Sequence, residues 1–289
     1  YRIAAVWGGH EGSLLLWMMM LCVWQLAVAK FSRHLPMPVL ARILNALSLS
    51  GLAELLSGGE GLSFDRMDGA FRWAGDAETF AMFDEALLTG NASILQSLDC
   101  AVSIAEAMGE AGCVDRWSAA QSRLVQAFAL TYSDVASAPS GVRPGVFVEP
   151  SSHSMDWYYP VLGGAVRGDA AHALIDLRWD EFVVDGLGIR CIDHRPWVTG
   201  AETSELALAL DAIGRTDEAA KLIDDIGHLR DPDGSYWTGF VFADGKRWPV
   251  EKSCWTSGAV VLAVDALSRC SGGNGVFRDV RQTASLPVR

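Results

Sequence analysis

The chain has 289 residues, half of them hydrophobic and 11 of them tryptophan, with a formal net charge of −12. This length and apolar content suffice for one large core or two ordinary ones. Residues 1–57 hold four basic and two acidic residues, whereas the remainder holds 19 basic and 33 acidic residues. Because nucleic acids demand a basic surface, the acidic main body argues against a nucleic-acid partner.

The six cysteines are scattered and form no Cys-x-x-Cys pair. Most of them fall inside apolar helical runs, where cysteine behaves as a small hydrophobic residue. This spacing predicts neither a zinc site nor a disulfide framework, and it is typical of a reducing compartment. The sequence therefore predicts no metal and no cofactor.

The first predicted element is an apolar run from Gly12 to Ala29, just long enough to span a bilayer as a helix. Lys30 and Arg33 follow it, which places its C-terminal end, and the main domain after it, on the cytoplasmic side. A second apolar run covers Leu40–Leu56. Residues 1–57 thus predict one or two membrane helices, with membrane association through residues 12–29. The alternative for the first run is a buried core helix.

This N-terminal part carries a family resemblance. The segments Ala4–Trp17 (AAVWGGHEGSLLLW) and Phe31–Pro36 (FSRHLP) resemble a segment of CcmF, the membrane haem-lyase subunit of cytochrome c maturation. The family's tryptophan-rich haem-handling loop has no counterpart here. The resemblance implies a haem-handling maturation role as one functional alternative, which loss of a haem absorbance band in His10→Ala would test.

After a linker at Ser57–Gly61, the chain repeats one arrangement, in which a polar loop runs into an apolar helix. Thr89, Thr199 and Thr256 each stand at such a start, 110 and 57 residues apart, so a period of about 55 fits. Two helices with two loops need a repeat of that length. The period therefore predicts a succession of α-hairpins whose first helices begin at one common rim.

The hairpins follow in order. Their first helices are expected over 94–108, from His153 onward and over 199–213; their return helices are expected over 115–132, 170–182 and 218–229. Gly109 and Gly214 are expected to stop the first and third helices. Asp244-Gly245 predicts a β-hairpin turn within 240–248, and a last helix covers 260–267. Thr199 and Glu202 have the spacing of a capping box at the third hairpin.

The main part of the chain, residues 64–280, carries a second resemblance. The blocks Ser154–Ala165, Trp179–Arg190, Arg195–Glu202 and Asp233–Gly239 are similar to bacterial prenyltransferase- or squalene-cyclase-like proteins of the α/α-toroid superfamily. That superfamily also includes, in a related architecture, six-hairpin glycosidases. The resemblance implies an all-α fold, an incomplete α/α toroid of about four hairpins, followed by a tail at 281–289. The cyclases' Asp-x-Asp-Asp motif and the prenyltransferases' zinc ligands are absent.

The expected rim would gather acids and aromatic rings around one mouth. Aromatic faces stabilise carbocations and stack on sugar rings, and paired carboxyl groups cleave glycosidic bonds. The candidate catalytic residues are Asp156, Asp193 and Glu202, although Glu202 could equally be a cap. The candidate substrate-binding residues are Trp157, Tyr158, Tyr159, Arg195, Trp197, Tyr236 and Trp237. Trp237, together with Trp248 and Trp255, could instead pack within the hairpin.

Three functions follow as alternatives. The first is an enzyme, a transferase or hydrolase, that acts on a small-molecule substrate of prenyl or glycan type at the mouth. The second is a non-catalytic helical-repeat binding module tethered to a membrane. The third is the haem-maturation role implied by the N-terminal resemblance.

Overall fold

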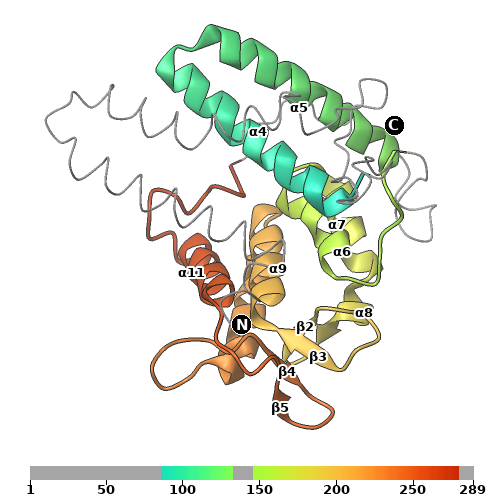
Figure 1. The fold of residues 1–289 in the computed structure, drawn as a ribbon, viewed down its shortest axis with the longest axis vertical. Helices are drawn as coiled ribbons and strands as arrows, with labels where there is room; N and C mark the ends of the chain where they lie inside the picture. The colour runs from blue at the N-terminus through green and yellow to red at the C-terminus, as the bar shows by residue number, and fades with distance from the viewer. Residues whose placement is uncertain (1–85, 133–145, 280–289) are drawn as a thin grey trace, which may run out of the picture. The chain divides into compact units, whose positions relative to one another are not determined.

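The computed structural model describes residues 86–132 and 146–279 (Figure 1). In these ranges the chain forms eight α-helices, one 3₁₀ helix and a small sheet. The helices are α4 (Leu88–Met108), α5 (Ala111–Thr131), α6 (Met155–Leu162), α7 (Gly168–Leu177), α8 (Trp179–Phe182), α9 (Gly200–Ala212), α10 (Thr216–Asp225), η1 (Ile226–Leu229) and α11 (Cys254–Ser268). The strands are β1 (Val183–Val184), β2 (Gly188–Arg190), β3 (Trp197–Thr199), β4 (Gly239–Val241) and β5 (Lys246–Arg247).

Contacts divide the described residues into two compact units. Residues 101–117, where α4 ends and α5 begins, belong to one unit, and the other described residues belong to the second. Between α4 and α5, Gly109 adopts a left-handed φ of 73°, as expected for a glycine that stops a helix. In the second unit, the buried Gln121 of α5 donates a hydrogen bond from Nε2 to Asp99 Oδ1 of α4 at 3.0 Å.

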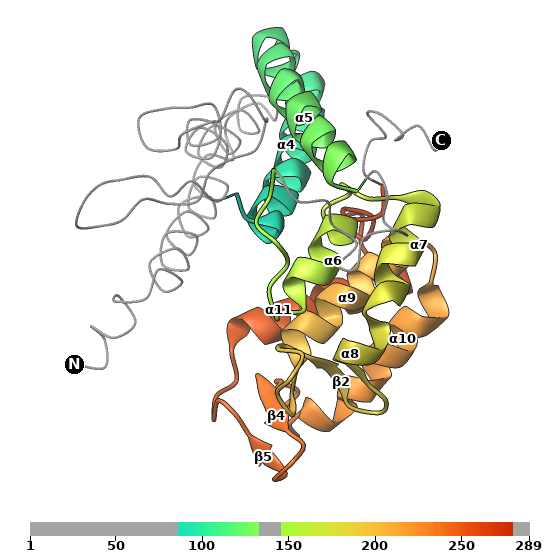
Figure 2. The same ribbon diagram turned by 90° about the vertical axis from the view of Figure 1, so that its right-hand side faces the viewer.

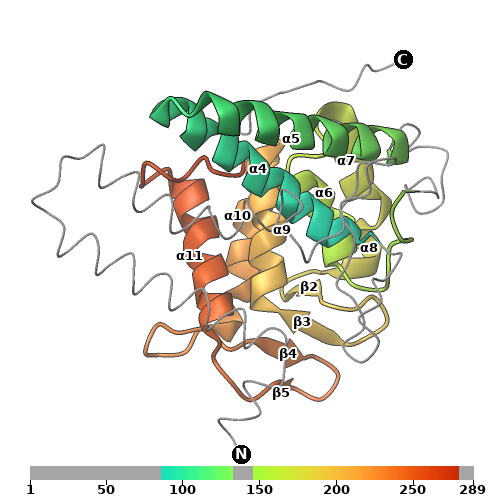
Figure 3. The same cartoon turned by 45° about the horizontal axis from the view of Figure 1, so that its top comes forward.

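Helix α9 is the centre of the second unit. Every residue from Gly200 to Asp211 is buried except Glu202, so this helix is covered on all sides. Helices α6, α10 and α11 pack directly against it, as Figures 1 and 3 show. Helix α10 has only Ala219 and Leu222 buried, which is the pattern of an outer helix with one apolar face.

The five short strands form one antiparallel sheet in the order β1-β2-β3-β4-β5, and this sheet lies at the start of α9 (Figure 2). Strand β2 is fixed to α9 because Ile189 N donates to Thr203 Oγ1 at 2.9 Å. The sheet corrects the prediction of an all-α fold. Only its last hairpin, β4–β5, was expected, and its turn at Asp244-Gly245 is confirmed, with Gly245 at a φ of 72°.

The predicted helices that fall on described residues are present, while the ring they were expected to build stays a prediction. The return helices appear as α5, α7 with α8, and α10 with η1. The toroid and its four hairpins are not established by these elements. No helix in the described ranges is both long and apolar enough to span a membrane. The span predicted at residues 12–29, the second run at Leu40–Leu56 and His10 all lie outside these ranges.

Candidate functional site

The starts of α6, α9 and α11 lie beside one another and are joined through main-chain hydrogen bonds. Ser154 N, at the start of α6, donates to Cys191 O at 2.9 Å, in the loop that leads to α9. Gly200 N, the first residue of α9, donates to Thr238 O at 3.1 Å. Thr238 N in turn donates to Glu251 O at 3.1 Å, just ahead of α11. These bonds connect the starts of three helices, and we call this end of the second unit the rim. The common rim of all the predicted hairpins stays a prediction.

The helix caps at this rim differ from the predicted ones. Thr199 precedes α9, but its side chain accepts no cap hydrogen bond, and its buried Oγ1 has no partner among the described residues. The predicted capping box of Thr199 and Glu202 is therefore wrong, which leaves the Glu202 carboxylate available for other contacts. At α11 the cap is Ser253, whose Oγ accepts a hydrogen bond from Thr256 N at 3.1 Å.

Five side chains from α6, α9 and the intervening loop form what we call the acid cluster. It consists of Tyr158, Tyr159, Cys191, Glu202 and Glu205. The fully buried Tyr158 donates its hydroxyl to Glu205 Oε2 at 2.7 Å. Tyr159 lies close enough to Glu205, and Cys191 to Glu202, for the charge of each carboxylate to act on the neighbouring side chain. The cluster thus places two carboxyl groups near each other, and the Tyr158 hydroxyl binds one of them.

Burial dominates the electrostatics of the acid cluster. Loss of hydration raises the pKa of Glu205 to about 7, the Tyr158 hydrogen bond opposes this rise, and the nearby Glu202 charge adds to it. Burial, followed by the charge of Glu205, raises the pKa of both Tyr158 and Tyr159. Burial and Glu202 likewise raise the pKa of Cys191. Glu205 is therefore a carboxyl group that holds a proton to near neutral pH, as a general acid must.

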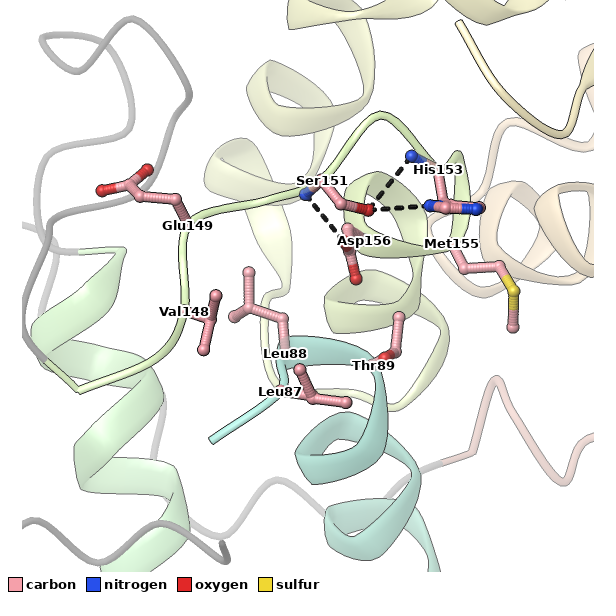
Figure 4. Close-up of a pocket in the computed structure, with 9 residues that line it drawn as sticks. All are labelled: Leu87, Leu88, Thr89, Val148, Glu149, Ser151, His153, Met155 and Asp156. Atoms are coloured by element: carbon pink, nitrogen blue, oxygen red, sulfur yellow. Dashed lines mark hydrogen bonds between the residues drawn. The ribbon is translucent and has the colours of Figure 1, made fainter. Parts of the chain in front are cut away.

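Asp156 lies in the first turn of α6 and lines a pocket of about 250 Å³ (Figure 4). Its Oδ2 accepts a hydrogen bond from Ser151 N at 2.8 Å, which fixes the carboxylate against the preceding loop. Asp156 and Tyr159 are three residues apart on one short helix, so they share a face. The predicted acid on α6 therefore lies about one helical turn from the acid cluster.

Asp193 is held in an ion-pair network. Burial alone would raise the pKa of Asp193, but hydrogen bonds from His194 and the charges of His194 and Arg178 lower it overall. The Oδ1–Nδ1 distance to His194 is 2.7 Å, and Arg178 Nη2 lies 3.4 Å from Oδ2. The backbone N of Asp193 also donates a hydrogen bond to Ser152 O at 3.0 Å. These contacts tie the loop before α9 to the start of α6.

The predicted aromatic residues occupy different environments. Trp157 is 1% exposed, donates Nε1–H to Leu174 O at 2.8 Å and stacks on Phe182. Trp197 on β3 donates to Trp248 O at 2.8 Å. Tyr236 and Trp237 pack against the core cluster of Ile226, Leu229 and Val260. Tyr158 and Tyr159 are therefore the predicted aromatic residues that the structure brings to the carboxyl groups.

Arg195, predicted to bind substrate, lies in the turn ahead of β3 with its side chain exposed. Its backbone N donates to Ile192 O at 3.0 Å, which closes that turn. Within the described ranges, no group of three or more His, Cys, Asp and Glu side chains is placed to hold a metal ion.

Glu205 is the site residue that the sequence reasoning missed. The signal was present, because Glu205 follows Glu202 by three residues and must share its face of the helix. It is also an acidic residue directly ahead of the apolar run Leu206–Leu210, where a charge is costly without a partner.

No family model matches the chain. Over 212 residues, 73% of its length, the chain is 52% identical to the "MMP endo-(1,4)-3-O-methyl-alpha-D-mannosidase" of Mycolicibacterium hassiacum, and the match covers 55% of that protein. Over 56 residues, 19% of its length, it is 50% identical to CcmF of Haemophilus influenzae and 46% identical to CcmF of Escherichia coli K12. The chain thus spans about half the length of the mannosidase and less than a tenth of either CcmF.

These findings confirm one expected resemblance and replace the other. The similarity to CcmF is present over a short stretch. The resemblance to prenyltransferase- and squalene-cyclase-like proteins is not shown; the long match is to a glycosidase instead. Of the two substrate types expected at the mouth, the glycan type is consistent with this match, and the prenyl type has no support.

Proposed function

We propose that the chain provides the catalytic site of a glycoside hydrolase that cleaves within an O-methylated α-mannoside chain. The 52% identity over 212 residues to a protein named as an endo-mannosidase supports this choice of substrate class. The observation that carries the reaction type is the buried Glu205 carboxyl beside Glu202, with a pKa of about 7.

The reaction needs two carboxyl groups with different roles. One protonates the glycosidic oxygen as the bond breaks, and the other acts as nucleophile or activates water. We assign the proton donor to Glu205, because its raised pKa keeps a proton available near neutrality. The Tyr158 hydroxyl, bonded to Oε2 of Glu205, orients that carboxyl group.

The second carboxyl group comes from Glu202 or Asp156. Glu202 is the one residue between Gly200 and Asp211 of α9 that is not buried, so it can meet a substrate at the rim. Asp156 is held by Ser151 N at the edge of the pocket on α6. Tyr159, half-buried and near Glu205, supplies an aromatic face for a sugar ring.

The test is hydrolysis of (1,4)-linked 3-O-methyl-α-mannose oligosaccharides by the purified chain, with release of new reducing ends as the readout. We expect Glu205→Gln to lower kcat by about 10²- to 10⁴-fold, because the amide cannot donate the proton. We expect a comparable loss from either Glu202→Gln or Asp156→Asn, and that loss identifies the second group. Unchanged turnover in all three folded variants would remove this site assignment.

A further inference from the structure

The pocket of about 250 Å³ that Asp156 lines has both apolar and polar residues in its wall. It lies between the first turns of α4 and α6 and the segment that precedes α6 (Figure 4). Its lining residues are Leu87, Leu88, Thr89, Val148, Glu149, Ser151, His153, Met155 and Asp156. Four of these side chains are aliphatic or thioether, and they come from α4, from α6 and from the connecting segment.

The polar part of the lining is preorganised. Ser151 Oγ lies 3.0 Å from His153 Nδ1 and accepts a hydrogen bond from His153 N at 3.2 Å. Ser151 N holds Asp156 Oδ2 at 2.8 Å. These three residues lie on the α6 side of the pocket in Figure 4, while Leu87 and Leu88 lie on the α4 side with Val148 close by. A ligand in the pocket would therefore meet an apolar surface and a polar one at once.

We propose that this pocket receives an O-methyl group of a methylated hexose, and that it gives the site its preference for methylated glycan. This inference rests on the function proposed above. An unmodified hexose carries hydroxyl groups around its ring, and aliphatic walls would leave some of them without a hydrogen-bond partner. A methyl ether has no hydroxyl proton to satisfy and adds apolar surface that gains from burial.

The position of the pocket fits this role. Met155 and Asp156 line it, and Tyr158 and Tyr159 of the acid cluster follow in the same helix, a rise of about 4.5 Å from Asp156 to Tyr159. A sugar whose methyl group enters the pocket would therefore have its ring beside Asp156, about one helical turn from Tyr159 of the acid cluster. The free hydroxyls of that sugar would face Asp156, Ser151 and His153.

The test uses substitutions that keep side-chain shape and add polarity. Val148→Thr and Met155→Gln replace a methyl group and a thioether by hydrogen-bonding groups of similar size. We expect the wild-type protein to prefer methylated over unmethylated (1,4)-α-mannose oligosaccharides by at least about tenfold in kcat/KM. In each variant this ratio should fall by about three- to tenfold. Val261→Thr, the same exchange at a 65% exposed site on α11, is the matched control and should leave the ratio unchanged.

Binding is measured separately from turnover. Saturation-transfer NMR with methyl 3-O-methyl-α-mannoside should show contact of its 3-O-methyl protons with the wild-type protein, and this contact should weaken in both pocket variants. If binding shows this pattern while neither glycan is cleaved, the proposed function fails and the pocket assignment stands. If the wild type cleaves glycan but Val148→Thr and Met155→Gln keep its ratio, the pocket assignment is overturned alone. Absence of both cleavage and methyl contact overturns both.

Discussion

Glu205 is a carboxyl group placed where water is scarce, and its chemistry follows from that placement. The residue is 9% exposed and lies on a helix that is buried on nearly all sides. Burial raises the pKa of this carboxyl to about 7, and the Tyr158 hydroxyl restrains the rise because it stabilises the ionised form. The protonation state of Glu205 thus depends on the hydrogen bond that Tyr158 of α6 donates to it.

The first prediction concerns activity and pH. We expect kcat/KM for glycan hydrolysis to fall as the pH rises through about 7, because ionised Glu205 has no proton to donate. Tyr158→Phe removes the hydrogen bond that favours the ionised form, so the fall should move to higher pH. The measurement is a pH series of kcat/KM for the two proteins. An unmoved alkaline limb in Tyr158→Phe would assign that limb to another group.

The second prediction concerns stability and pH. Unfolded Glu205 ionises near 4.5 and the folded residue near 7, so between these values the folded state binds more protons. The free energy of unfolding should therefore decrease as the pH rises from about 4.5 to about 7. Above about pH 7 Glu205 is ionised in both the folded and the unfolded state, so it causes no further change.

Urea unfolding at several pH values measures this effect, with Glu205→Gln as the control that cannot ionise. The difference in slope between the two proteins isolates Glu205 from the other carboxyl groups. Equal slopes over that range would mean that Glu205 has an ordinary pKa in the folded protein.

At the residue scale, the sequence pointed to part of this site. The expected residues Tyr158, Tyr159 and Glu202 lie near one another, because each follows a predicted helix start by a few positions. Glu205 was missed because one carboxyl in an apolar helix looks like a packing residue until its partner is known. That partner, Tyr158, is 47 positions away, and no local pattern reveals such a contact.

At the scale of elements, the contact between α4 and α6 depends on a single glycine. Gly163 caps α6, and a Cβ added there would lie 2.4 Å from Ala92 O, a backbone atom of α4. A helix backbone cannot yield as a flexible side chain does, so any larger residue would push the two helices apart.

The third prediction follows from this close contact. Gly163→Ala should lower the free energy of unfolding by about 1–3 kcal/mol, as overpacking of a tight core contact does. Gly258→Ala is the matched control, because Gly258 lies inside α11 with no atom within 4 Å of its added Cβ. There alanine should stabilise the helix by up to about 1 kcal/mol. Equal Tm shifts in both variants would contradict the assigned contact.

The longer helices were predictable here because their apolar runs end at recognisable stop residues, such as Gly109 after α4 and Gly214 after α9. The strands β1, β2 and β3 have two or three residues each, too few for an alternation to be seen. The hairpin β4–β5 has strands just as short, yet it was expected because Asp244-Gly245 signals its turn. Local turn chemistry therefore revealed what strand pattern could not.

At the scale of the whole second unit, α9 joins two regions of different character. Its start carries Glu202 and Glu205, and its last turn carries Asp211, which is 3% exposed. Asp211 accepts hydrogen bonds from Arg269 at 2.7 and 2.8 Å and from Arg278 at 2.7 Å. The chain after α11 is thereby fastened to the central helix. The ring of hairpins stays a prediction, because a repeated helix pattern indicates which helices are neighbours but not whether they close into a ring.

The fourth prediction addresses this fastening. Asp211→Asn removes the charge that pairs with both Arg269 and Arg278. We expect the free energy of unfolding to fall by about 3 kcal/mol, which is the lower end of the usual cost of breaking a buried ion pair. The lower end applies because Arg269 and Arg278 stay partly exposed, at 41% and 26%, and can recover some hydration.

Asp185→Asn provides the comparison, since it breaks an ion pair with Lys221 in which the side chains are 91% and 55% exposed. Such a pair contributes less than about 1 kcal/mol, so urea unfolding should barely change. Salt separates the two further: 1 M NaCl screens the surface pair strongly and the buried one little, so the cost of Asp211→Asn should persist. Loss of that cost in high salt would show that Asp211 acts through long-range charge rather than through its buried hydrogen bonds.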